Sequence, residues 1–302
     1  MFAQQVSTWL QRRGIHYSWV MAAVTFLTML TMSAALGLPG VILQPLSHEF
    51  GWTNEQISSA LALRFALYGL MGPFAAVLME RWGLRAVMCT GLALVGAGMA
   101  LATLATQLWQ LFILWGLMLG LGTGLTALVL GAVVANRWFT ARRGLVIGLL
   151  TASSATGQLA FLPLAAWIIE HAGWRYAVIP IFAGSALVAL LALCLVRNRP
   201  CDIGLAPLGE AFVPDSTPVA AAAMTFRTPF VALREASGNR TFWILFGTFF
   251  ICGLSTNGLV QTHFVSLCAD YGLTAVPAAS VLAMMGAFDF FGTILSGWLS
   301  DR

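Results

Sequence analysis

Long apolar segments separated by polar stretches dominate the chain. Eight of them are long enough to cross about 30 Å of hydrocarbon as helices, at 19–44, 55–79, 86–106, 108–135, 144–169, 174–196, 241–267 and 277–300. Most connections are short, so successive helices are expected to run antiparallel. Because a helix satisfies its own backbone hydrogen bonds in lipid, the pattern predicts an all-α polytopic membrane protein.

Composition supports this prediction. Hydrophobic residues make up 59% of the 302 positions and charged residues only 9%, against about 25% in soluble domains. The first apolar segment follows Arg12 and Arg13, as a signal peptide would. Its length favours a retained helix, with the arginine pair setting orientation rather than acting as a twin-arginine signal.

All 15 basic residues are arginines, and their positions predict the topology. Thirteen lie in alternate loops or tails, and the intervening loops hold only Arg175. The positive-inside rule therefore places the N-terminus, the turns at 80–85 and 136–143, and the segment 197–240 in the cytoplasm. The net charge of +4 is thus topogenic, and no nucleic-acid partner is expected.

The sequence repeats itself with an offset of 221 residues. Glu49-Phe50-Gly51 corresponds to Asp270-Tyr271-Gly272, and Glu80-Arg81 corresponds to Asp301-Arg302. The seventh and eighth segments therefore match the first and second. Such a duplication predicts a six-helix bundle at 1–196, a cytoplasmic linker at 197–240 with a short helix near 228–237, and two helices of a second bundle at 241–302. By this count eight of an expected twelve helices are present, and the alternative is a native eight-helix protein.

Charged residues at the end of the second segment form the most specific motif. A carboxylate at a helix C-terminus opposes the helix dipole, so Glu80 is expected to need nearby cations. Arg81 and Arg85 are the candidates, with Gly83 permitting a tight turn. Because Asp301 and Arg302 repeat the arrangement, we interpret these five charged residues as a gating network that forms in one conformation and breaks in another; ordinary topogenic charge is the alternative.

The turn at 76–85 resembles the signature loop between helices two and three of the major facilitator superfamily, with Ala76 and Glu80 in place of the usual Gly and Asp. Further stretches resemble bacterial oxalate/formate antiporters and monocarboxylate porters, among them Gly40–Pro45 and Asn136–Phe139. The resemblance covers most of the chain. It implies a major facilitator-type helical bundle that works by alternating access.

Two ionised side chains lie deep within apolar segments, and such residues are functional candidates by default. Arg64 lies roughly 24 Å along the helix from Glu80, and Asp289 roughly 18 Å from Asp301. The resemblance to monocarboxylate porters implies proton coupling at Asp289, although Thr293 stands where those porters usually have an arginine. Structural ion pairing is the alternative for Asp289, and structural pairing or snorkelling for Arg64.

The seventh segment carries a polar stripe that is unsuited to face lipid. Asn257 and Gln261 are four residues apart and share a helical face, and His263 follows near the outer end. Cavity lining is implied by the resemblance, and interhelical hydrogen bonding is the alternative. Glycines at 116, 120 and 124, and at 144 and 148, are expected to serve close helix packing.

The sequence thus predicts a secondary transporter for a small organic anion, monocarboxylate-like, using proton symport or anion exchange. A transporter of another small solute, or a non-transporting sensor or inactive fragment, remains an alternative. Expected partners are the substrate, protons and the bilayer; the protein is expected to be a monomer in a bacterial plasma (inner) membrane. The five scattered cysteines and the absence of a nucleophile–base or phosphate-binding motif argue against an enzyme, a metal site and a cofactor.

Overall fold

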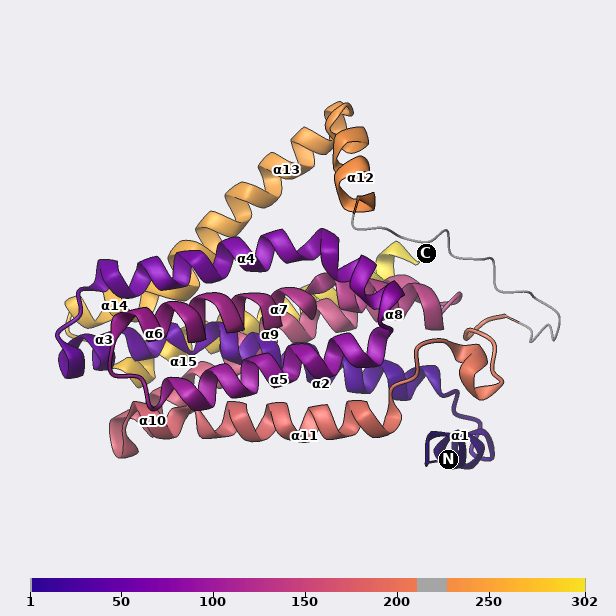
Figure 1. Cartoon of the computed structure of the whole chain (residues 1–302), viewed down its shortest axis with the longest axis horizontal. Coiled ribbons are helices and arrows are strands. Elements are labelled where there is room, and N and C mark those ends of the chain that lie inside the picture. Colours follow the sequence, from indigo (N-terminus) through magenta and orange to yellow (C-terminus); the bar gives the residue numbers. More distant parts are fainter. Residues whose placement is uncertain (1, 211–226, 302) are drawn as a thin grey trace.

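The computed structural model describes residues 2–210 and 227–301, whose regular elements are almost entirely helical (Figure 1). In chain order they are α1 (Phe2–Gln11), α2 (Ser18–Gly37), α3 (Pro39–Phe50), α4 (Asn54–Arg81), α5 (Leu84–Ala102), α6 (Leu108–Leu111), the π-helix η1 (Phe112–Leu119), α7 (Gly120–Leu125), α8 (Leu128–Trp138), α9 (Arg143–Ala172), α10 (Trp174–Ala177), α11 (Ile179–Leu195), the 3₁₀ turn η2 (Pro200–Ile203), α12 (Thr228–Ser237), α13 (Arg240–Cys252), the π-helix η3 (Gly253–Val260), α14 (Gln261–Asp270) and α15 (Ala275–Ser300).

Seven helical stretches in the described ranges are long and apolar enough to span a membrane. They correspond to seven of the eight predicted segments. The eighth, 144–169, coincides with α9, a single helix of 30 residues. Within α9, Phe161–Ala172 forms an apolar stretch. The predicted linker helix at 228–237 is also present as α12.

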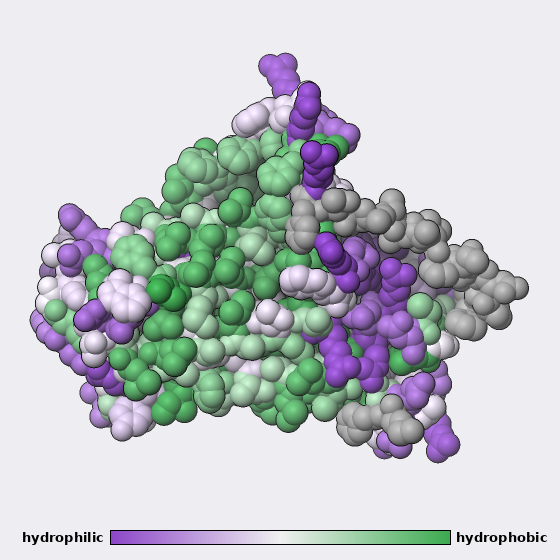
Figure 2. Space-filling model, viewed as in Figure 1, coloured by the Kyte–Doolittle hydropathy of each residue, from purple (hydrophilic) through white to green (hydrophobic). Residues whose placement is uncertain are grey.

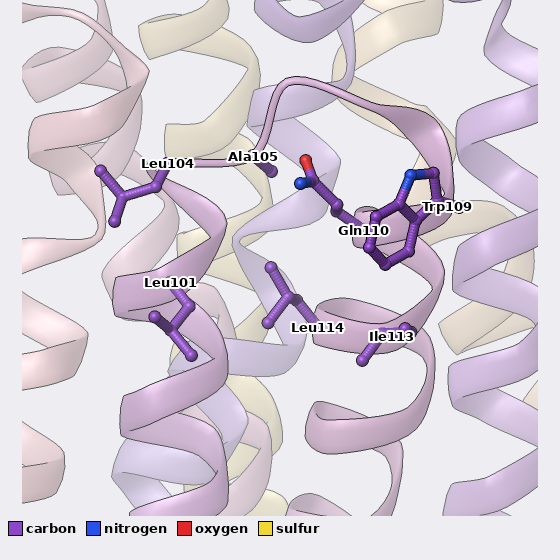
Figure 3. A pocket seen from close by; sticks show the side chains of 7 residues that line it. All are labelled: Leu101, Leu104, Ala105, Trp109, Gln110, Ile113 and Leu114. Atoms are coloured by element: carbon purple, nitrogen blue, oxygen red, sulfur yellow. The ribbon is translucent and has the colours of Figure 1, made fainter.

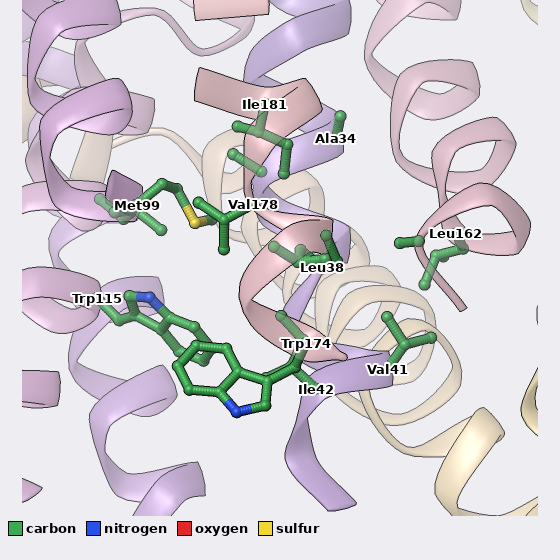
Figure 4. Close-up of a cluster of buried hydrophobic side chains, with 14 of the residues drawn as sticks. Ala34, Leu38, Val41, Ile42, Met99, Trp115, Leu162, Trp174, Val178 and Ile181 are labelled. Atoms are coloured by element: carbon green, nitrogen blue, oxygen red, sulfur yellow. The ribbon is translucent and has the colours of Figure 1, made fainter. Parts of the chain in front are cut away.

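Helices α2 to α11 form an elongated bundle, against which α14 and α15 pack while α13 and α12 project from one side (Figure 1). Apolar side chains form a broad middle band, and hydrophilic residues gather at the two ends (Figure 2). One buried cluster lies toward the end formed by α3 and α10, where Trp115 and Trp174 approach each other (Figure 4). The distribution is that of a membrane-embedded bundle.

The two halves of the predicted repeat adopt matching local structures. Gly51 and Gly272, 221 positions apart, both have positive φ, at 67° and 82°. Thr53 and Thr274 are the N-cap residues of α4 and α15, again with the same offset. Helix boundaries that repeat with the sequence offset confirm that these segments are structural counterparts.

The first membrane helix is interrupted next to Pro39. α2 ends at Gly37 and α3 begins at Pro39, since proline lacks the amide that would continue the helix. At the corresponding height of the seventh helix, η3 gives way to α14 after Val260. Both counterparts therefore depart from regular α-helix at the same place in the repeat.

Glycines bring helices unusually close, as the sequence predicts. A Cβ on Gly120 would lie 3.1 Å from the carbonyl oxygen of Arg64, and one on Gly124 would lie 3.2 Å from Cα of Tyr68. This glycine row thus packs α7 directly against α4. It fixes the backbone position of Arg64 in the middle of the bundle.

Candidate functional site

One end of the bundle collects most of the arginines, and we call it the arginine-rich end. There α4, α8, α11 and α15 terminate and α9 begins, on the right of Figure 1. In Figure 2 the same region carries a dense hydrophilic cluster. The predicted gating residues therefore lie at one end of the molecule.

Glu80 forms ion pairs with two arginines that the sequence analysis did not assign to it. Its Oε1 accepts a hydrogen bond from Nη2 of Arg137 at the end of α8, and its Oε2 lies 3.7 Å from Nη2 of Arg199. Glu80 is 25% exposed and Arg137 15% exposed in their side chains. This arrangement links the ends of α4 and α8 with the segment after α11.

The sequence assigned three further arginines to this network, Arg81, Arg85 and Arg302. Arg81 is the last residue of α4, and Arg85 contributes its backbone N–H, which donates to Oδ1 of Asn198 at 3.2 Å. Arg302 lies outside the described residues. Asn198 also lies close to Gly83, where an added Cβ would approach its side-chain amide to 2.6 Å. The role of Arg85 as a partner of Glu80 stays a prediction.

Asp301 caps the first turn of α9. Its two carboxylate oxygens accept hydrogen bonds from the backbone N–H groups of Gly144, at 2.7 Å, and Leu145, at 2.8 Å. The N-cap residue Arg142 makes no side-chain cap hydrogen bond. Because helix N-termini leave such donors unsatisfied and attract negative charge, a carboxylate from α15 supplies here what α9 lacks.

Close glycine contacts surround this cap. A Cβ on Gly144 would lie 2.6 Å from the carbonyl oxygen of Gly297, and one on Gly148 would lie 3.1 Å from Cα of Gly297. The α9 and α15 backbones are thus in direct contact at the arginine-rich end. This junction joins the beginning of α9 to the end of α15, through hydrogen bonds between residues 156 and 157 positions apart in the chain.

The opposite end carries its own charged cluster. Arg175 donates from Nη1 to Oε2 of Glu49 at 3.0 Å, and its Nη2 lies 2.7 Å from Oε1. Trp174 donates from Nε1 to the same Oε2 at 2.6 Å. The one arginine that departs from the topological pattern therefore has a specific partner, which joins the end of α3 to α10.

Arg64 is the most deeply buried charged residue among those described. It is 1% exposed, and its Nε and Nη1 have no hydrogen-bond partner in the described part of the chain. The guanidinium carbon lies 4.6 Å from the centre of the Phe65 ring. A cation–π contact compensates only a fraction of the cost of removing this charge from water, so Nε and Nη1 of Arg64 remain without a hydrogen-bond acceptor among the described residues.

Asp289 lies near the middle of α15. Its carboxylate Oδ1 accepts a hydrogen bond from the hydroxyl of Thr293 at 3.3 Å, and the residue is exposed. Thr293, which replaces the arginine usual in the resembling porters, is therefore its partner. Arg64 and Asp289 form no ion pair with each other in this conformation of the described chain.

The polar residues of the seventh helix are only partly described. His263 is exposed on α14, whereas the side chains of Asn257 and Gln261 lie outside the described set. Near them, Nε2 of Gln44 on α3 lies 3.5 Å from Oγ of Ser266 on α14. The first and seventh helices thus contact each other at the end opposite the arginines.

A shallow pocket between α5 and α6 lies apart from all of these charges (Figure 3). Leu101, Leu104 and Ile113 line it, and each is more than 40% exposed. Gln110 adds the one polar side chain drawn there, and its Oε1 accepts hydrogen bonds from the backbone N–H groups of Thr106 and Gln107. An apolar lining of this kind suits contact with hydrocarbon rather than binding of a polar solute.

Comparison with known proteins identifies the family. The profile of the Major Facilitator Superfamily matches residues 21–302. The chain belongs to the major facilitator superfamily. This membership confirms the fold predicted from the signature turn at 76–85. Members of this superfamily are membrane transporters rather than enzymes.

Among curated relatives, mouse monocarboxylate transporter 11 is 28% identical over 289 residues, which cover 95% of this chain and 60% of that protein. Bovine monocarboxylate transporter 13 is 26% identical, covering 94% and 62% respectively. An uncharacterized transporter of the superfamily from Bacillus subtilis, YcxA, is 22% identical, covering 96% and 67%. The chain therefore spans about three-fifths of the length of these two monocarboxylate transporters.

A solved structure of a D-xylose-proton symporter superposes with a TM-score of 0.62. It is 17% identical and the alignment covers 92% of this chain and 68% of that one. At this identity the likeness concerns the fold alone. It shows that the two chains share their helical arrangement.

Proposed function

We propose that the protein is a secondary transporter of a small organic anion of the monocarboxylate class, working by alternating access. The single observation that carries the proposal is the buried guanidinium of Arg64, whose Nε and Nη1 have no hydrogen-bond partner among the described residues. The names of the mouse and bovine relatives favour the same substrate class.

A carboxylate would complete the coordination of Arg64. The guanidinium presents parallel N–H donors that match the two oxygens of a carboxylate, and such charge-assisted pairs are stronger in a dry interior than in water. Because Arg64 is 1% exposed, a substrate reaches it only after the bundle opens. Binding would then repay the cost of the unpaired charge in the closed conformation.

Asp289 is the proposed proton-coupling residue. A charged carboxylate in the middle of a membrane helix is costly, whereas the protonated form is not. Thr293 can donate to the ionised form or accept from the protonated one, so their contact accommodates both states. Proton symport would move this proton with the anion, and anion exchange would leave it in place.

The junction between α9 and α15 is the proposed gate. We assign the arginine-rich end to the cytoplasm on the positive-inside rule, in a bacterial plasma membrane. The proposed division places a first lobe at 1–196, a linker at 197–240 and part of a second lobe from 241. Release of Asp301 from the α9 amides would open the cytoplasmic side while the contact between α3 and α14 held the other side.

Uptake by protein reconstituted in liposomes tests the proposal. Radiolabelled lactate and pyruvate serve as anionic probes and D-xylose as a neutral one, each in counterflow and under a proton gradient. Arg64→Gln should raise the KM for the anions roughly 10- to 150-fold, which corresponds to about 1.5–3 kcal/mol for charged hydrogen bonds. Arg64→Lys should show a smaller rise in KM than Arg64→Gln. The control Arg234→Gln, at an exposed position of α12, should keep the wild-type KM.

The same assay separates coupling from binding. Asp289→Asn should abolish gradient-driven uptake but retain counterflow, whereas Asp270→Asn at the end of α14 should leave both intact. Gradient-driven uptake that survives Asp289→Asn would exclude its coupling role. Transport of xylose without lactate or pyruvate would favour a neutral-solute transporter, and no flux of any probe would favour a sensor or an inactive fragment.

A further inference from the structure

The segment that follows α11 crosses the arginine-rich end in an ordered path. It runs from Asn198 through η2 to Glu210 and contacts three separate parts of the bundle. We call residues 198–210 the clasp. The sequence predicts only a linker here, since its composition is rich in proline and alanine.

The beginning of the clasp engages the Glu80 side of the end. Oδ1 of Asn198 accepts from the backbone N–H of Arg85 at 3.2 Å, and its carbonyl oxygen lies 3.4 Å from Nη1 of Arg137. Arg199, the next residue, approaches Glu80. The clasp therefore touches both members of the Glu80–Arg137 pair and the turn that follows α4.

The end of the clasp pairs with the turn that precedes α9. Leu208 donates from its backbone N–H to the carbonyl oxygen of Trp138 at 2.9 Å, and its carbonyl oxygen accepts from the N–H groups of Thr140, at 2.9 Å, and Ala141, at 3.0 Å. The hydroxyl of Thr140 donates to Oε1 of Glu210 at 2.8 Å. These contacts hold residues 138–141 against the clasp, and Phe139 and Leu208 form an isolated parallel β-bridge there.

The turn held in this way is conformationally strained. Arg142 has φ of 62°, the one positive value for a residue other than glycine in the described part of the chain. A side chain with Cβ disfavours this region, so the turn needs external contacts to stay in place. Directly after it come Gly144 and Leu145, whose N–H groups receive Asp301.

We propose that the clasp is a positioning element of the gate. By bonding to residues 138–141, it holds the strained turn so that the first amides of α9 point toward Asp301. Through Asn198 and Arg199, it also connects this turn to the Glu80–Arg137 pair. Among the described residues, Asp301 bonds to Gly144 and Leu145 and to no residue of the clasp, so the clasp acts through the turn. The inference rests on the proposed gate function of the α9–α15 junction.

Gly209 offers a selective way to disturb the clasp. Its φ is 103°, and a Cβ there would lie 2.7 Å from Cβ of Ala141 and 2.8 Å from its backbone nitrogen. Gly204 is a matched control, because its φ of 71° is also positive but a Cβ there meets nothing within 4 Å. Gly209→Val therefore pushes the clasp away from the turn, whereas Gly204→Val introduces the same side chain at a clasp position where the Cβ meets nothing within 4 Å.

Hydrogen–deuterium exchange of the full chain in lipid nanodiscs measures the amides in question. Asp301→Asn should speed exchange at Gly144 and Leu145 roughly 2- to 30-fold, the range expected for loss of a helix cap. Gly209→Val should speed exchange at Thr140 and Ala141, which lose their acceptor, and also at Gly144 and Leu145. In the Asp301→Asn background, Gly209→Val should add nothing further at Gly144 and Leu145.

The outcomes separate the two proposals. If Asp301→Asn leaves the exchange of Gly144 and Leu145 unchanged, the gate proposal fails. If Asp301→Asn acts but Gly209→Val affects only residues 140–141, or its effect at 144–145 persists undiminished beside Asp301→Asn, the clasp is not a positioning element. Leu208→Pro, which removes the donor to Trp138 and adds no bulk at Ala141, provides a second variant and should reproduce the Gly209→Val pattern.

Discussion

Gly297→Ala gives the sharpest test of the α9–α15 junction. The added Cβ would lie 2.5 Å from the carbonyl oxygen of Gly144, 2.9 Å from Cα of Gly148 and 3.2 Å from its nitrogen. All three are backbone atoms, so no side chain can turn aside. Since ordinary contact begins near 3.4 Å, the two helices must separate by about 0.9 Å at this point.

The expected magnitude follows from this overlap. Overpacking of a tight interface costs about 1–3 kcal/mol, which corresponds to a roughly 5- to 150-fold shift away from the closed junction. Alanine also stabilises the helix itself by about 0.5–1 kcal/mol relative to glycine. Gly292→Ala, on the same helix, adds a Cβ that meets nothing within 4 Å, so it should carry the helical gain alone.

Distance measurements between spin labels distinguish the two variants. Labels replace Trp82, which is 57% exposed after α4, and Leu299, which is 57% exposed on α15. Gly297→Ala should move population to longer distances, while Gly292→Ala should match the parent. A parent-like distribution for Gly297→Ala, or an equal shift for Gly292→Ala, would refute the idea that backbone contact at Gly297 closes this end.

Three further substitutions probe the packing and charge contacts by thermal unfolding in detergent. Glu80→Gln should cost up to about 1 kcal/mol, because its pairing with Arg137 is only partly shielded from water; an equal loss in a variant that already lacks Arg137 would contradict the pairing. Glu49→Gln should lower the stability by a similar amount by weakening the contact with Arg175, and an unchanged stability would mean that this ion pair does not stabilise the fold. Gly120→Leu should abolish folding, because it places a large side chain against the α4 backbone, and recovery of a stable protein would show that the α4–α7 contact is adaptable.

The sequence predicted the fold from features that depend on local chemistry. Segment length and apolarity located the helices, and the 221-residue repeat placed α15 as the counterpart of α4. The structure adds that Thr53 and Thr274, with the same offset, are their N-cap residues. Prolines are a weaker signal: α2 ends just before Pro39, but α4 and α9 continue through Pro73 and Pro163. These signals need no knowledge of which helices are neighbours.

The partners of the charged residues were harder to predict because they depend on the tertiary arrangement. Glu80 was expected to use Arg81 or Arg85, which are close in sequence, but it pairs with Arg137 and Arg199, which helix packing brings to it. Asp301 bonds to backbone amides, which leave no mark on residue type. The glycines at 144 and 148 were the available signal, since small residues show where a helix is approached closely though not by which partner.

The repeated acid–arginine motif has diverged in what it binds, and the difference decides which copy can act as a gate. Glu80 pairs with Arg137, which belongs to the same bundle, and with Arg199, which belongs to the segment after it. These contacts need not change when the α13–α15 group moves. Asp301 reaches across to α9, and its partners are fixed N–H groups at a helix N-terminus, where negative charge is favoured. A contact between two bodies breaks when they separate, whereas a contact within one body does not. In the proposed gate, the second copy is therefore the one whose contact is coupled to opening, and the first copy stabilises the surface that α15 contacts.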